Sequence, residues 1–177
     1  VRQLRDGIAE MVKAAMIRDE ALLDMILEQF RDLPKNPVIP ADRDSGHLPS
    51  SKPVTLAVSS LAGINALLSR ALSIKKTVVE ADEKETGDRK LLNFGHTLGH
   101  AAESRGGYSV LTHGEGVALG MQWITRQSEA RGLSEPGTAE RLESALNALG
   151  FETAPPLDFQ SLKDWVLRDK KMTDTGL

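Results

Sequence analysis

The sequence predicts an all-α fold, and three observations support this prediction. Apolar side chains recur every three or four residues over most of the chain, which is the period of an amphipathic helix. Strand-like alternation of apolar and polar residues is weak. The 177 residues contain no internal repeat and suffice for one domain with a hydrophobic core. We therefore expect a single helical domain over residues 1–177.

The first helical pattern runs over residues 4–30 and predicts either one long helix or two helices joined near Asp19. The stretch that follows, "DLPKNPVIPADRDSGHLPSSKP", holds five prolines among serines and charged residues. Proline cannot continue a helix, because its ring removes an N–H donor and clashes with the preceding turn. This composition predicts a long exposed loop over residues 32–55.

Helical periodicity returns after this loop. The expected helices cover residues 56–79, 91–105, 114–131, 136–149 and 159–170. A charged turn, "EADEKETGDR", separates the first two of them and contains Glu83 and Glu85. "RGG" is a stop signal for the second helix, and Pro136 and Gly150 bound the fourth.

Charge and composition exclude several classes of function. The formal net charge is −3, the sequence pI is about 5.8 and no basic stripe is present, so nucleic acid is not an expected partner. The absence of cysteine excludes disulfides and thiolate metal sites. No apolar run approaches the roughly 18 residues of a membrane span, so no membrane partner is expected. Because the chain starts without Met, in the middle of a helical pattern, we expect a fragment of a longer protein.

The stretch "LLNFGHTLGHAAES", residues 91–104, places His96 and His100 four residues apart. On a helix this spacing puts both imidazoles on the same side. Gly95 and Gly99 precede them, at a cost of about 1 kcal/mol each relative to alanine, and would let another backbone come close. The pattern alone leaves two interpretations open: a tightly packed helix with hydrogen-bonded core histidines, or a metal or catalytic site.

A third histidine favours the metal interpretation. His113, in "THGEGVALGM", starts the next helix after a short connection, so the chain can return it to the side of His96. Zinc and similar ions bind imidazoles, and a catalytic site often adds a carboxylate and leaves a position for substrate. Glu10, in "DGIAEMVKAAMI", is a candidate carboxylate, but a surface ion pair with Lys13 at i+3 explains it equally well.

Three segments together resemble the C-terminal domain of the 3-dehydroquinate synthase family: "DGIAEMVKAAMI", "KKTVVEADEKETGDRKLLNFGHTLGHAAE" and "LTHGEGVALGM". "DKK" near the end also fits, whereas the loop over residues 32–53 is longer than the family pattern and the segment between His100 and His113 is slightly altered. The resemblance implies a helical metal-binding domain that follows an N-terminal α/β domain with bound NAD. No glycine-rich phosphate loop after a strand is present, so we expect that nucleotide domain to be absent from this chain.

The resemblance also implies roles for individual residues. The metal ligands it implies are Glu10, His96 and His113. The catalytic residues it implies are His100, a non-ligand histidine on the substrate side, and Lys13, near the substrate hydroxyls. The implied substrate-binding residues are Lys75, Arg89, Asn93, Lys170 and Lys171. Among these, the resemblance assigns Lys75 and Arg89 to the substrate carboxylate, and Lys171 or Lys170 to the phosphate.

The residues themselves support these roles unequally. Asn93, His96 and His100 lie at i, i+3 and i+7, which predicts one stripe of a single helix. Arg89 precedes that helix, and a guanidinium can hold a carboxylate through two parallel hydrogen bonds. Lysines are usually solvated, so any role for Lys75, Lys76, Lys170 and Lys171 depends on the resemblance.

The resemblance implies a cytoplasmic lyase of the shikimate pathway, which makes aromatic amino acids. Such an enzyme converts 3-deoxy-D-arabino-heptulosonate 7-phosphate, an acidic sugar phosphate, to 3-dehydroquinate and phosphate. Its cofactors would be NAD and a divalent ion, zinc or cobalt. The full-length enzyme is expected to be a homodimer, and the isolated chain is expected to be inactive because it lacks a dinucleotide site.

Three alternatives stay open. Other sugar-phosphate cyclases share the implied fold and metal site, but we expect them to alter several of the substrate-side residues present here. Metal-dependent alcohol and polyol dehydrogenases have a similar helical domain but need no carboxylate grip, so Lys75, Arg89 and Asn93 speak against them. A non-catalytic helical interaction domain with structural histidines is the third alternative, and such a domain would bind no metal tightly.

Overall fold

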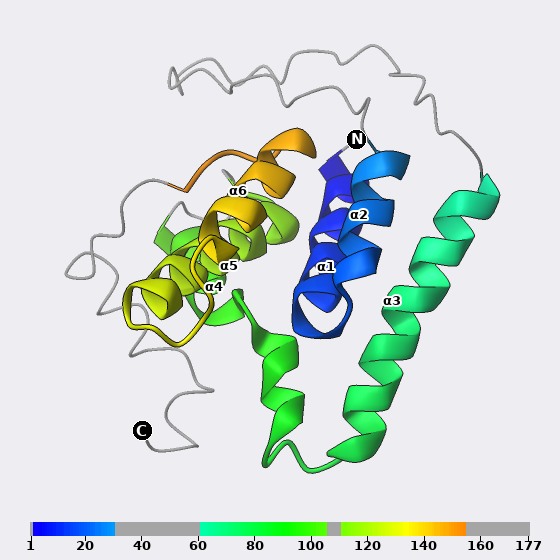
Figure 1. Ribbon diagram of the computed structural model, residues 1–177, viewed down its shortest axis with the longest axis horizontal. Helices are drawn as coiled ribbons and strands as arrows, with labels where there is room; N and C mark the ends of the chain where they lie inside the picture. Colours follow the sequence, from blue (N-terminus) through cyan, green and yellow to red (C-terminus); the bar gives the residue numbers. More distant parts are fainter. Residues whose placement is uncertain (1, 31–60, 106–110, 155–177) are drawn as a thin grey trace.

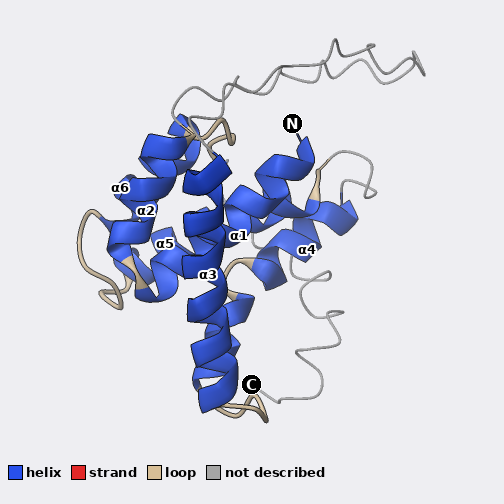
Figure 2. Cartoon of the chain, turned by 90° about the vertical axis from the view of Figure 1, so that its right-hand side faces the viewer, coloured by secondary structure: helices blue, strands red, loops and turns tan. Residues whose placement is uncertain are grey.

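A computed structural model describes residues 2–30, 61–105 and 111–154 of the chain. Every regular element in these ranges is helical and none is a strand (Figure 2), so the prediction of an all-α fold is confirmed. The elements are α1 (Arg2–Arg18), α2 (Glu20–Gln29), α3 (Leu61–Ala81), the 3₁₀ helix η1 (Asp88–Asn93), α4 (His96–Arg105), α5 (His113–Ala130) and α6 (Thr138–Ala148). The expected loop over residues 32–55, the expected helix over residues 159–170, Lys170 and Lys171 lie outside the described residues.

The hydrophobic core forms where α1 packs against α2, α3 and α5 (Figure 1). Helix α5 in turn packs against α4 and α6, so α1 and α5 together form the centre of the bundle. Both present apolar stripes at helical spacing, as the periodicity predicted. The fully buried side chains of this core include Ile8, Val12, Leu22, Ile26, Leu67, Val117, Met121, Leu142 and Leu146.

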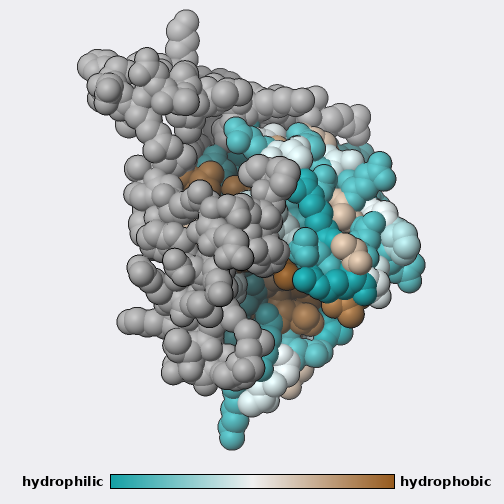
Figure 3. All heavy atoms as spheres, turned by 90° about the vertical axis from the view of Figure 1, so that its left-hand side faces the viewer, coloured by the Kyte–Doolittle hydropathy of each residue, from teal (hydrophilic) through white to brown (hydrophobic). Residues whose placement is uncertain are grey.

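On the face shown in Figure 3, hydrophilic side chains dominate the described surface and apolar groups gather in only a few places. None of the described helices is both long and apolar enough to cross a membrane.

The first helical pattern divides into two helices at Asp19. The Asp19 carboxylate accepts a hydrogen bond from the backbone N–H of Leu22 at 3.1 Å and thereby caps the N-terminus of α2. The same carboxylate accepts hydrogen bonds from the guanidinium of Arg70 on α3, with Nη2 at 2.8 Å from Oδ1. These bonds, above all those from Arg70, hold the pKa of Asp19 below its usual value. One side chain therefore both starts α2 and ties it to α3.

Replacing Asp19 by alanine is expected to lower the free energy of unfolding by about 1–2 kcal/mol, chiefly through loss of the cap, since an exposed ion pair adds only about 0–1 kcal/mol. Asp19→Asn keeps a capping oxygen and loses the charge, so it should cost less. Because the folded-state pKa is lowered, the charge stabilises the fold at neutral pH and loses this effect as pH falls through that pKa. Denaturant titrations should show the gap between wild type and Asp19→Asn closing in acid; a gap that widens would contradict this account.

The histidine segment is not one helix, so the prediction of a single helix over residues 91–105 is wrong. The chain forms η1 up to Asn93, and α4 begins only at His96. Gly95, between them, has φ +80°, a left-handed conformation that interrupts a helix and that favours glycine. His96 and His100 share α4, but Asn93 lies on a separate element and does not continue their stripe.

The expected close contact at Gly95 and Gly99 is confirmed. A Cβ on Gly99 would lie 2.7 Å from the carbonyl oxygen of Gly116 on α5, and one on Gly95 would lie 2.7 Å from the carbonyl oxygen of Val117. Gly120, on α5, makes the matching contact, because a Cβ there would overlap the carbonyl group of Gly95. The glycines thus let α4 pack backbone to backbone on α5, and this contact fixes where the histidines lie.

The other boundaries agree with the sequence to within a few residues. The predicted helix from residue 114 begins at His113, and the helix predicted from Pro136 begins at Thr138, after Gly137 in a left-handed conformation. Gly150, with φ +82°, follows the end of α6 as predicted.

Candidate metal and substrate site

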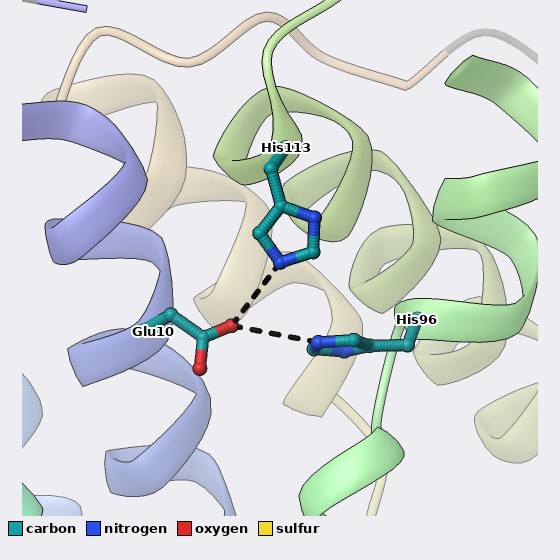
Figure 4. Close-up of side chains that lie close together, drawn as sticks. All are labelled: Glu10, His96 and His113. Carbon is teal, nitrogen blue, oxygen red and sulfur yellow. Dashed lines mark ion pairs between the residues drawn. The ribbon is translucent and has the colours of Figure 1, made fainter. Parts of the chain in front are cut away.

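Three side chains from three helices meet at the centre of the site (Figure 4). Glu10 comes from the middle of α1, and His96 and His113 are the first residues of α4 and α5. The Oε1 atom of Glu10 lies 3.7 Å from Nε2 of His96 and 3.9 Å from Nε2 of His113. Their candidate ligand atoms all lie within 4.8 Å of one another. The structure therefore brings together the three residues expected to bind the metal.

The start of α5 is held firmly, and this determines the position of His113. Thr112 and Glu115 form a capping box, in which the Thr112 N–H donates to Glu115 at 2.8 Å and the Glu115 N–H donates to Thr112 at 3.3 Å. The Gly114 N–H donates to Asp6 Oδ1 on α1 at 2.8 Å. Asp6 precedes Glu10 by one helical turn, so the same face of α1 carries the anchor for α5 and the candidate ligand.

Lys13 is not part of a surface ion pair. Its side chain is only 7% exposed, and its Nζ donates to both oxygens of Glu10, at 2.9 and 2.8 Å. The interpretation of Glu10 and Lys13 as a surface pair is therefore wrong for the lysine. A buried cation and the carboxylate that it contacts face the two histidines.

Burial and the nearby Lys13 lower the pKa of His96 to about 4, although the Glu10 carboxylate opposes this shift. The imidazole is consequently neutral at neutral pH and keeps a lone pair for coordination. Two imidazoles and one carboxylate form a donor set that suits zinc and similar divalent ions. The residues present thus fit a metal of this class.

A cleft of about 520 Å³ opens beside this cluster, between α1, α3 and η1. Glu10 and His96 line it, and so does Lys13. Three of the expected substrate-binding residues line the same cleft: Lys75, Arg89 and Asn93. The remaining walls include the apolar side chains of Met11, Ala14, Leu68, Leu72, Val79 and Leu92.

The turn before η1 holds Arg89 at the edge of this cleft. The Asp82 carboxylate accepts the backbone N–H groups of Thr86, Gly87 and Arg89 at 3.0, 2.7 and 3.1 Å. These bonds, that of Gly87 foremost, lower the pKa of Asp82. The Arg89 guanidinium donates to the carbonyl oxygen of Glu83 at 2.6 Å. Arg89 is thereby fixed by both its backbone and its side chain.

Glu85 belongs to the charged turn, as expected, but it also lines the cleft. It accepts a hydrogen bond from Asn93 Nδ2 at 2.8 Å and has φ +55°. This left-handed conformation is unusual for a residue with a side chain, and it is not evident from the sequence.

His100 lies beside the cluster rather than in the cleft wall. Its ring centroid is 5.5 Å from that of His96 and 5.8 Å from that of His113. It forms a second group with His113 and Glu103, whose ligand atoms also lie within 4.8 Å of one another. Glu103 was not singled out from the sequence, because a glutamate near a helix end is usually solvated.

Fold and site together define an all-helical domain in which a carboxylate and two imidazoles adjoin a cleft lined by lysine and arginine. Residues 7–172 match the 3-dehydroquinate synthase C-terminal family, and the chain belongs to that family. The resemblance found in the three sequence segments is thus confirmed.

Relatives named 3-dehydroquinate synthase support the same assignment. The protein from Clostridium perfringens is 33% identical over 99% of this chain and 43% of its own length. That from Dictyoglomus thermophilum is 35% identical over 96% of this chain and 41% of its own length. That from Enterococcus faecalis is 39% identical over 82% of this chain and 34% of its own length. The chain therefore spans about two fifths of the length of the first two relatives.

Proposed function

We propose that this chain is the metal- and substrate-binding part of a 3-dehydroquinate synthase, a cytoplasmic lyase of the shikimate pathway. One observation carries the proposal: Glu10 and His96, two of the three candidate metal ligands, line the same cleft as Lys75 and Arg89. To bind a polyol that carries a carboxylate, one cleft must offer both a metal ion for the hydroxyl groups and cationic side chains for the carboxylate. An N-terminal domain that binds NAD would complete the enzyme, and we propose a homodimer for the full-length protein.

Glu10, His96 and His113 would hold the divalent ion, zinc or cobalt. When bound, the ion would act as a Lewis acid that acidifies a substrate hydroxyl. NAD, bound by the N-terminal domain, would supply the reversible oxidation that allows phosphate to leave 3-deoxy-D-arabino-heptulosonate 7-phosphate and a carbocycle to form.

The side chains of the chain itself would bind and orient this substrate. Lys75 and Arg89 would hold its carboxylate, and the fixed guanidinium of Arg89 suits a bidentate contact. Asn93, held by Glu85, would donate to or accept from a ring hydroxyl.

Two further groups would act on the substrate. Lys13, buried against Glu10, would donate to a substrate hydroxyl beside the metal ligands. His100, which lies beside His96 and His113 and outside the cleft wall, would contact the substrate from that side and move a proton, as an imidazole can near neutral pH. Lys170 or Lys171 would reach the phosphate.

Two alternatives from the same structural class stay open, namely another sugar-phosphate cyclase and a metal-dependent alcohol or polyol dehydrogenase. Lys75 and Arg89 in the cleft favour an acidic substrate over a simple alcohol. A non-catalytic interaction domain is the alternative of a different class. The hydrogen bonds that hold Arg89 at the edge of the cleft suit ligand binding, and they have no evident use in such a domain.

The chain alone is expected to release no phosphate from the heptulosonate phosphate, because the hydride steps need NAD and its binding domain. Mixed with the separately produced N-terminal portion of the Clostridium perfringens relative, it should release phosphate and form 3-dehydroquinate. Arg89→Gln should raise KM in this mixture more than it lowers kcat, while Arg131→Gln, at the C-cap of α5, should change neither. Catalytic phosphate release by the chain alone would contradict the expectation, and a competent mixture that turns over only a neutral polyol would favour a dehydrogenase.

A further inference from the structure

We infer that Glu103 is a positioning residue for His113: its buried carboxylate accepts a hydrogen bond from the Nδ1–H of His113, so that the Nε2 lone pair faces Glu10 and His96. This inference rests on the metal site of the proposed function and adds to it a residue outside the ligand set. A neutral histidine ring has one protonated nitrogen and one nitrogen with a free lone pair. The hydrogen-bond acceptor beside one nitrogen determines that this nitrogen keeps the proton, so that the lone pair of the other nitrogen is free to bind a metal.

The geometry places His113 between two carboxylates. Nδ1 of His113 lies 3.5 Å from Glu103 Oε1, and Nε2 lies 3.9 Å from Glu10 Oε1. The ring therefore points one nitrogen into the candidate metal cluster and the other away from it, toward Glu103. The Nδ1 contact, at 3.5 Å, is longer than the roughly 2.7–3.2 Å of a full hydrogen bond, and we infer that it shortens to one when Nδ1 carries the proton.

Glu103 is built into the fold and is not a solvated surface glutamate. The residue is 8% exposed, and Oε1 accepts no hydrogen bond from the described residues. Gly116 on α5 makes room for it, since a Cβ there would lie 2.5 Å from Glu103 Oε1. Burying a carboxylate oxygen costs free energy unless it accepts a hydrogen bond, and the imidazole N–H of His113 is a donor that can supply one.

The two carboxylates do not compete equally for a proton on His113. Lys13 already donates to both oxygens of Glu10, whereas Glu103 Oε1 has no such donor among the described residues. Glu103 is also the nearer of the two. The proton therefore belongs on Nδ1, and the Nε2 lone pair faces Glu10 and His96. Metal-binding histidines in general donate their second N–H to a carboxylate or carbonyl, and loss of that partner weakens metal binding roughly 10–100-fold.

The same atoms allow a different arrangement, in which His100, Glu103 and His113 bind an ion of their own. Nδ1 of His113 cannot both carry a proton and bind that ion, so the two arrangements predict different results. Positioning by Glu103 predicts one zinc per chain and a protonated Nδ1, whereas a second site predicts two zinc ions.

The test compares Glu103→Leu and Glu103→Gln with wild type in the 177-residue chain. Zinc affinity is measured by competition with a chromophoric chelator, and the His113 tautomer is measured in the metal-free chain by long-range ¹H–¹⁵N correlation. Glu103→Leu should weaken zinc binding roughly 10–100-fold and shift His113 toward the Nε2–H tautomer. Glu103→Gln, which keeps an acceptor oxygen, should lose less on both measures. Glu129→Gln is the matched control, because Glu129 accepts the backbone N–H groups of Gly137 and Ala139 far from His113, and it should change neither measure.

Gly116→Ala tests the same idea without removing the carboxylate, since the new Cβ displaces Glu103 Oε1. It should shift the tautomer and zinc affinity in the same direction as Glu103→Leu, and it decides the matter if Glu103→Leu fails to fold. Unchanged zinc affinity and an unchanged tautomer in these variants would overturn the inference, as would a second zinc that only the Glu103 variants lose. If wild type binds no zinc, the proposed metal site fails, and the tautomer alone still decides the role of Glu103.

Discussion

Replacing Gly120 by alanine is expected to destabilise the domain by about 3 kcal/mol, at or above the upper end of the usual cost of overpacking. The added Cβ would overlap the carbonyl group of Gly95 and lie 2.9 Å from the backbone nitrogen of Gly99. Backbone atoms cannot swing aside as the tip of a side chain can, so α4 would have to move away from α5. Gly99→Leu, whose Cβ meets the backbone of Gly116, should cost about 1–3 kcal/mol for the same reason.

Gly7→Ala is the matched control for this expectation. Gly7 lies within α1, and a Cβ there would meet nothing within 4 Å. Alanine should therefore stabilise the domain by about 1 kcal/mol through its higher helix propensity. The free energy of unfolding of all three variants can be measured by urea titration. If Gly120→Ala and Gly7→Ala change it by the same amount, the glycines do not hold α4 against α5.

Much of this fold could be predicted because its signals are local. Apolar spacing located α1, α2, α3, α5 and α6, with a division near Asp19 as one of two possibilities. The stop signal at Gly150 marked the end of α6, where that glycine has a left-handed conformation. The return of His113 to the side of His96 also followed from a local signal, the start of a new helix after a short connection. Their ring centroids lie 5.2 Å apart.

The parts that could not be predicted depend on contacts between distant segments. Gly95 sits in an apolar run that reads as helix, and its left-handed conformation becomes evident only where α4 meets Met121 and Val117 of α5. For that reason Asn93 was placed on the wrong element. Nothing in the local sequence distinguishes Glu103 from a solvated glutamate near the end of a helix. Its burial depends on the distant Gly116, which leaves room for the carboxylate.

His96→Ala, His113→Ala and Glu10→Ala are each expected to weaken zinc binding by more than a hundredfold, whereas His100→Ala should leave it nearly unchanged. The three sensitive residues supply the ligand atoms that surround one point, from α1, α4 and α5. Removal of a direct ligand should exceed the roughly 10–100-fold effect expected for an outer partner. His100 shares a side of α4 with His96, but its ring lies 5.5 Å from that of His96 and outside the cleft wall.

Calorimetric titration of zinc into wild type and the four alanine variants measures this difference directly. The same solutions allow a second measurement, because an ion that binds only the folded chain stabilises it by RT ln(1 + [L]/Kd), and tighter binding therefore raises the thermal midpoint further. Zinc should therefore raise the midpoint of wild type and of His100→Ala, and it should raise the midpoints of the other three far less. His100→Ala is the internal control, since it removes an imidazole of the same kind from the same helix. If His100→Ala abolishes binding and His113→Ala does not, the ion binds the simple i, i+4 pair of α4 and Glu10 and His113 have another role.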